Sequence, residues 1–261
     1  MRTILAVVTG LALLVTPTYA KAQHYPPNPK LLQEGKRLYA RYCEGCHAKN
    51  GNGRGKSAEE LDIHCRDFTQ AVFKFRSTPS GYLPTDEDLY RTITHGIRLS
   101  TDSPRNMRSF KDLSPEKRWA LVDYIKTFSD RWQDPEDHAA PIVIPNRPPA
   151  TQERIDLGRQ VWGKVRCAQC HGPGGKGNGP SAEGLKDRRG NPIPPADLTN
   201  LALLKGGHRP QDIYRTFTTG LDGTPMPSYG DSLTNDQRWD LVYYVLSLGL
   251  GERGVIERYG H

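Results

Sequence analysis

"CEGCHAKNGNGRG" (residues 43–55) and "CAQCHGPGGKGNG" (residues 167–179) are the two stretches that decide the fold of this 261-residue chain. Each stretch begins with two cysteines separated by two residues, followed directly by a histidine and then by a glycine-rich run. The second stretch begins 124 residues after the first, which places the two histidines at His47 and His171. A pattern of this length that returns at a fixed offset indicates two copies of one structural unit.

Other segments recur in the same order on both sides of these motifs. The matching pairs are "RDFT" at 66 with "ADLT" at 196, "DLYRTITHG" at 88 with "DIYRTFTTG" at 212, and "RWALVDYI" at 118 with "RWDLVYYV" at 238. Their offsets are 130, 124 and 120, so only the loop lengths change. We therefore expect two tandem domains that share one fold.

Each copy has the pattern of an all-α domain. In the first copy, Asn28 and Pro29 can open a helix that runs into the cysteine motif, and Thr151 can open its counterpart. Each copy also ends in an amphipathic helix. Ser114-Pro115 begins the first of these helices, and Thr234 with Gln237 forms a capping box before the second. The aromatic and branched residues of these two helices are interpreted as core.

The N-terminal segment is interpreted as a secretory signal peptide. Arg2 precedes an apolar stretch from Ile4 to Val15, and "AKA" ends at Ala22. The stretch is shorter than the roughly 20 residues of a membrane span, so an uncleaved anchor is the less favoured alternative. The expected organisation is a signal peptide (1–22), a first domain (23–134), a proline-rich linker (135–149) and a second domain (150–261). This organisation predicts a periplasmic protein.

The charge of the chain does not indicate a nucleic-acid binder. The formal net charge is +7 for the whole sequence, without a concentrated excess in either half. Three neighbouring basic residues, Lys186, Arg188 and Arg189, are interpreted as solvated surface, with docking to an acidic partner as the alternative.

The C-x-x-C-H pentad is the attachment signature of haem c. Its two thiols add to the two vinyl groups of one haem, and the adjacent imidazole becomes an iron ligand. A redox disulfide or half of a zinc site would use the same cysteine pair, but neither explains the trailing histidine, its repetition and the export signal. We therefore predict two covalently bound haem c groups. The attachment residues are Cys43, Cys46 and His47 in the first domain and Cys167, Cys170 and His171 in the second.

Two methionines are the candidate sixth ligands. Apart from Met1, the chain contains only Met107 and Met226, one in each copy and at corresponding places before the last helix. Met226 lies between two prolines, whereas Met107 follows Asn106 and has charged neighbours. Thioether ligation favours ferrous iron and raises the potential relative to bis-histidine ligation. The four iron ligands predicted are thus His47, Met107, His171 and Met226.

On these residues, both halves resemble class I cytochrome c domains, and the whole chain resembles the tandem dihaem c-type cytochromes of the bacterial periplasm. The resemblance covers residues 28 to about 249. It implies that the first and last helices of each domain cross through a glycine and an aromatic ring, at Gly35 and Tyr39 and at Gly158 and Trp162. It also implies electron transfer as the function.

Two functions are therefore considered. The first is a periplasmic electron carrier without catalytic residues, either a free shuttle or the cytochrome subunit of a larger oxidoreductase, with redox proteins as donor and acceptor. Membrane association would then come only through a partner complex or an uncleaved signal segment. The second is a dihaem enzyme, a peroxidase or a thiosulfate dehydrogenase, with a special first haem. Cys65 as a thiolate ligand would favour the second function, but its loop precedes the region where the sixth ligand is expected. The spare histidines His64, His95 and His208 are interpreted as solvated.

Overall fold

The computed structural model describes residues 29–100 and 103–261; the predicted signal peptide and Asn28 lie outside the described residues. The first half contains α1 (Pro29–Tyr42), α2 (Glu44–His47), α3 (Lys56–Glu60), α4 (Asp86–His95) and α5 (Pro115–Lys126). The second half contains α6 (Gln152–Lys164), α7 (Ala168–His171), α8 (Pro210–Thr219), α9 (Asn235–Leu250) and α10 (Glu252–Tyr259). Three short 3₁₀ turns complete the elements, at Asp130–Gln133, Pro135–Asp137 and Leu201–Leu203. In this described part of the chain, β-structure is limited to two isolated bridges, so the all-α prediction is confirmed.

The helices begin at the residues that their sequences predict. Thr234 accepts a hydrogen bond from the Gln237 backbone N–H (3.2 Å), and the Gln237 side chain accepts one from the Thr234 N–H (3.0 Å). The side chain of Thr151 accepts from Arg154 at the start of α6, and Ser114 with Pro115 begins α5. Each of these caps satisfies or removes a backbone donor that the first helical turn leaves unpaired.

The first and last long helices of each half cross at a glycine, as the resemblance implies. A Cβ atom on Gly35 would lie 2.1 Å from the Ala120 carbonyl oxygen of α5, and one on Gly158 would lie 2.0 Å from the Asp240 carbonyl oxygen of α9. Aromatic rings pack beside both crossings, Tyr39 against Tyr124 at 5.2 Å and Trp162 against Tyr244 at 5.6 Å between ring centroids. In each half, the helix that makes this crossing leads into the cysteine motif: α1 ends directly before Cys43, and α6 ends shortly before Cys167.

Each half has its own hydrophobic core. Leu38, Leu121 and Val122 are buried in the first core, and Ile155, Trp239 and Leu241 in the second. The second core also contains Val255 of α10, a helix beyond the region that the repeat pattern covers. Separate cores explain why the sequence pattern repeats as a whole unit.

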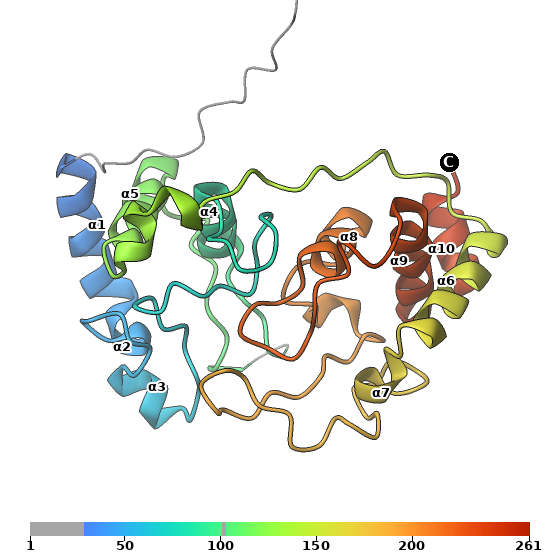
Figure 1. Cartoon of the computed structure of the whole chain (residues 1–261). Helices are drawn as coiled ribbons and strands as arrows, with labels where there is room; N and C mark the ends of the chain where they lie inside the picture. Colours follow the sequence, from blue (N-terminus) through green and yellow to red (C-terminus); the bar gives the residue numbers. More distant parts are fainter. Residues whose placement is uncertain (1–28, 101–102) are drawn as a thin grey trace, which may run out of the picture.

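The two halves lie side by side, and the linker runs in extended conformation along one edge of the pair (Figure 1). Arg76 of the first half is almost fully buried at the contact between them. Its guanidinium donates to the Thr219 carbonyl oxygen (2.6 Å) and forms an ion pair with Asp222 (2.8 Å) in the second half. Asp222 also accepts from the hydroxyl of Ser80 at 2.7 Å. The halves are therefore joined by buried polar contacts as well as by the linker.

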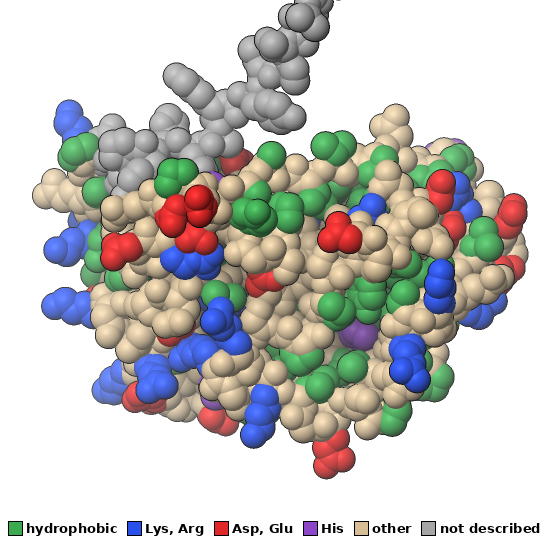
Figure 2. Space-filling model, in the orientation of Figure 1, with side chains coloured by type: hydrophobic (Ala, Val, Ile, Leu, Met, Phe, Trp, Pro, Cys, Tyr) green, Lys and Arg blue, Asp and Glu red, His purple; other side chains and the backbone are tan. Residues whose placement is uncertain are grey.

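Charged side chains are mixed over the face drawn in Figure 2. Lysine and arginine gather toward the lower left, over the region of α1 to α3, with aspartate and glutamate among them. Among the described residues, no helix is both long and apolar enough to cross a bilayer.

Candidate haem sites

The glycine-rich run folds back over each cysteine motif. The Gly53 N–H donates to the His47 carbonyl oxygen (3.0 Å), and Gly177 donates to that of His171 (2.8 Å). Gly53 has φ +76°, and a Cβ atom there would lie 2.5 Å from the Cys65 carbonyl oxygen. Glycine is needed at this position because the backbone is left-handed and a neighbouring loop approaches it closely. The repeated glycines thus pack the cysteine motif against the loop that contains residues 65–68.

That loop holds the histidine in each copy. The Nδ1 atom of His47 lies 3.0 Å from the Arg66 carbonyl oxygen, and that of His171 lies 3.1 Å from the Ala196 carbonyl oxygen. Arg66 and Ala196 are the first residues of the matching "RDFT" and "ADLT" segments. An Nδ1–H that donates to a carbonyl fixes the tautomer and leaves Nε2 as the nitrogen for a metal.

Burial favours the neutral form of both histidines. It lowers the pKa of His47 and of His171, although the backbone hydrogen bond to each ring acts in the opposite direction. Neutral imidazole is the form that binds iron. The Phe68 ring stacks on the His47 ring at 4.5 Å, and the matching position in the second copy is Leu198. The two pockets share their hydrogen bonds but differ in the side chain beside the imidazole.

Among the described residues, the motif cysteines belong neither to a disulfide bond nor to a cluster that could hold zinc. All five cysteines are free of disulfide bonds. In the part of the chain that the structure describes, no cluster of three or more histidine, cysteine or acidic side chains could hold a metal ion such as zinc. Burial raises the pKa of the Cys43 thiol and of the Cys167 thiol to about 12. Two half-buried cysteines and an adjacent histidine in each motif are the set of side chains that fits a thioether-linked haem.

The two methionines occupy equivalent positions in the folded domains. The Ile97 N–H donates to the Met107 carbonyl oxygen (2.9 Å), and the Leu221 N–H donates to that of Met226 (3.1 Å). Ile97 and Leu221 each follow the glycine that ends α4 or α8, and they are 124 residues apart. Both methionine side chains are half-buried and pack against the core of their own half. Their ligation of iron stays a prediction, and the common backbone arrangement supports it.

Cys65 lies on the loop that holds His47. It directly precedes Arg66 and is half-buried. Burial is the main cause that raises the pKa of Cys65 to about 12. Cys65 is thus on the loop that bonds to the predicted fifth ligand, His47, whereas the predicted sixth ligand, Met107, lies on a later loop. The three spare histidines considered as ligands, His64, His95 and His208, are exposed.

One surface interpretation was wrong. Arg189 is half-buried rather than freely solvated: its guanidinium donates to the Cys65 carbonyl oxygen (3.0 Å) in the other half of the molecule. Lys186 and Arg188 are exposed, as expected. Sequence reasoning missed Arg189 and Arg76 because their partners are distant in the chain. The only sequence signal was the change of offset from 124 to 130, which marks a longer loop before Ala196.

Two helical domains that each present C-x-x-C-H on a short helix, with a carbonyl-bonded histidine, define a c-type cytochrome. Residues 30–125 match the family described as cytochrome C oxidase, cbb3-type, subunit III, and residues 155–249 match the family described as cytochrome c.

Three similar proteins extend this result. The cbb3-type cytochrome c oxidase subunit FixP of Azorhizobium caulinodans is 28% identical over 232 residues, which are 86% of this chain and 64% of FixP. FixP of Sinorhizobium medicae is 35% identical over 114 residues, 41% of this chain and 34% of that protein. The chain therefore spans less than two thirds of these relatives. A solved chain of the Kuenenia stuttgartiensis reducing HAO-like protein complex Kustc0457/Kustc0458 is 41% identical, with a TM-score of 0.76 over 83% of this chain and 96% of that chain.

The chain belongs to the tandem dihaem c-type cytochromes. It therefore contains two covalently bound haem c groups, one in each cytochrome c domain, and these are electron-transfer domains.

Proposed function

We propose that this protein is a periplasmic dihaem cytochrome that passes electrons between redox partners as the cytochrome subunit of a larger oxidoreductase. The observation that carries the proposal is the equivalent position of Met107 and Met226, whose carbonyl oxygens accept from Ile97 and Leu221, the second residues after α4 and α8. With a methionine on one side and a histidine on the other, each iron would have no position left for a substrate. A free shuttle is the other form of the same function.

The haem supplies iron that takes up and releases one electron. The residues of the chain hold that iron in place and limit its contact with water. In the first domain Cys43 and Cys46 would tether the haem, His47 would bind iron through Nε2, and Met107 would bind on the other side. Cys167, Cys170, His171 and Met226 would do the same in the second domain. We propose domain limits of 23–134 and 150–261, joined by the linker at 135–149.

The relatives favour a subunit over a free shuttle. The FixP proteins are subunits of cbb3-type oxidases, and the solved relative belongs to an HAO-like complex. We infer by analogy that this chain also docks on a redox partner. Native purification followed by size-exclusion chromatography tests this inference, and elution at the size of a single processed chain would contradict it.

Optical and EPR spectra test the ligand assignment. The reduced and oxidised protein should show two low-spin haems per chain, each with histidine and methionine ligands. A high-spin or thiolate-ligated haem would instead indicate the peroxidase or thiosulfate dehydrogenase alternative. Mass spectrometry of exported protein tests the signal peptide, because cleavage after Ala22 leaves Gln23 at the N-terminus.

A further inference from the structure

The second domain contains a small hairpin that the first domain lacks. The copies match at an offset of 124 up to Gly179 and at 130 from Ala196, so the second copy has six more residues in this loop. Part of the longer loop turns back on itself between Leu185 and Ile193, whose backbone groups bond at 3.0 Å. At its tip, the Asp187 carboxylate accepts from the backbone N–H groups of Arg189 (2.9 Å) and Asn191 (3.0 Å). The tip is thus a defined turn.

The tip of the hairpin reaches the first haem pocket. Arg189 donates to the Cys65 carbonyl oxygen (3.0 Å) and to the Asn52 carbonyl oxygen (3.4 Å). Asn52 lies in the glycine-rich run after His47, and Cys65 lies in the loop that packs against that run. One guanidinium from the second domain therefore bridges the two loops that surround the first histidine.

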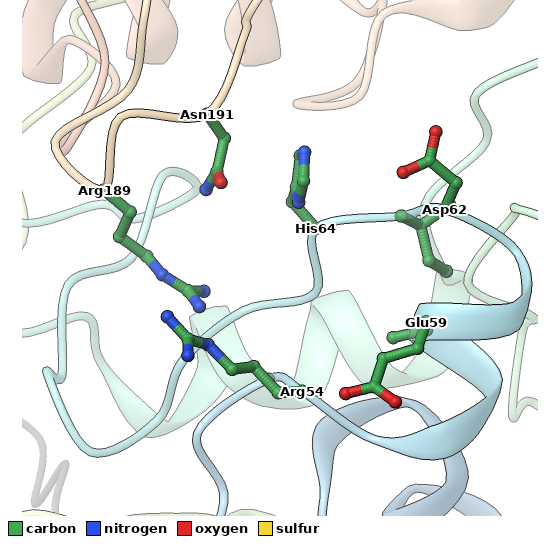
Figure 3. Close-up of a pocket in the computed structure, with 9 residues that line it drawn as sticks. Arg54, Glu59, Asp62, His64, Arg189 and Asn191 are labelled. Carbon is green, nitrogen blue, oxygen red and sulfur yellow. The ribbon is translucent and has the colours of Figure 1, made fainter.

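The hairpin is also fixed on its other side. The Arg188 N–H donates to the Gly223 carbonyl oxygen (3.0 Å), which precedes Met226 in the second domain. Figure 3 shows that Arg189 and Asn191 extend from the hairpin into a cleft of about 300 Å³, where Arg189 points toward Arg54 of the first domain. Glu59 and Asp62 of the first domain also line this cleft, so Arg189 brings its positive charge into a site where charges of both signs meet.

We propose that Arg189 is a cross-domain positioning residue for the first haem. It would hold the Cys65–Arg66 segment, whose Arg66 carbonyl orients His47, and it would place a positive charge beside that haem. A nearby cation favours the reduced state of iron because this state carries one positive charge less. Docking of the second domain would then raise the potential of the first haem. The proposal rests on the haem assignment made under the proposed function.

Spectroelectrochemical titration of the dihaem protein tests this proposal. Arg189→Gln removes the charge but keeps side-chain donors, and Arg189→Ala removes both. Arg188→Gln is the matched control, because it removes one charge from the adjacent, exposed residue. Each variant is also made together with Met226→His. This second substitution lowers the potential of the second haem, so the redox step that stays at the higher potential belongs to the first haem.

We expect Arg189→Gln to lower the potential of the first haem, Arg189→Ala to lower it further, and Arg188→Gln to leave it unchanged. Equal potentials for Arg189→Gln and Arg188→Gln would overturn the proposal, as would an equal shift of both haems. A purely structural Arg189 would reduce thermal stability without moving the potential, which also overturns it. If Arg189→Ala does not accumulate as dihaem protein, Arg189→Gln decides. The wild-type protein must first take up two electrons per chain in one-electron transitions, resolved or overlapping; if it does not, the proposed function fails rather than this inference.

Discussion

Gly158→Ala should destabilise the second domain through the crossing of α6 and α9. The new Cβ atom would lie 2.0 Å from the Asp240 carbonyl oxygen, about 1.4 Å closer than the 3.4 Å at which ordinary contact begins. No side-chain rotation can relieve this clash, because both atoms are fixed to helix backbone. Alanine gains about 1 kcal/mol of helix propensity over glycine, whereas overpacking of this kind costs about 3 kcal/mol. The net loss is about 2 kcal/mol, which lowers Tm by about 10 °C in a domain of this size.

The same helix supplies a control. A Cβ atom on Gly163 meets no atom within 4 Å, so Gly163→Ala should be neutral or should stabilise the protein by up to about 1 kcal/mol. Thermal unfolding of both dihaem variants, followed by far-UV circular dichroism, compares them directly. If Gly158→Ala were as stable as Gly163→Ala, the close helix crossing would not exist and the reasoning would be refuted.

Three further predictions concern the second pocket, the domain contact and acid stability. Met226→Ala should open the second iron, so that the reduced variant binds carbon monoxide in optical titrations; failure to bind would remove Met226 as the ligand. Arg76→Ala removes the buried guanidinium that pairs with Asp222, and loss of a hydrogen bond to a charged group costs about 1.5–3 kcal/mol. Calorimetry should then resolve two unfolding transitions at lower temperature, and an unchanged thermogram would argue against a stabilising domain contact. Burial raises the pKa of Asp212, but hydrogen bonds from two arginines, including Arg215, outweigh it and hold this pKa below the ordinary 3.8. The unfolded chain then takes up the proton first, so this contribution is complete above about pH 4 and is lost as pH falls through the folded pKa. Asp212→Asn should be less stable at neutral pH and should lose less stability than wild type between pH 5 and 3 in denaturant titrations; parallel losses would contradict the assignment.

The parts of the fold that repeat could be predicted from the sequence. The motif at Cys43 and Cys167 fixes a turn of backbone, because two thiols and an imidazole must reach one haem. The glycines at 35 and 158 could be assigned to helix crossings through the family resemblance. The carbonyl bonds to His47 and His171 could not be placed from the sequence, although the segments at 66 and 196 that supply them match.

The contacts between the halves could not be predicted. Arg76 and Thr219 are 143 residues apart, and no local pattern marks either as buried. Arg189 stands among other basic residues, and its partner is a backbone carbonyl, which leaves no trace in side-chain composition. The helix α10 was also missed, because it has no counterpart in the first copy with which to align it.

The linker has a consequence of its own. Val143, in the middle of it, is 88% exposed, while Arg76 and Arg189 join the halves elsewhere. A protease that cut the chain at Val143 would therefore leave two fragments bound to each other. In the intact protein the linker mainly gives each half a high effective concentration around the other. Two separately encoded polypeptides could therefore form the same assembly.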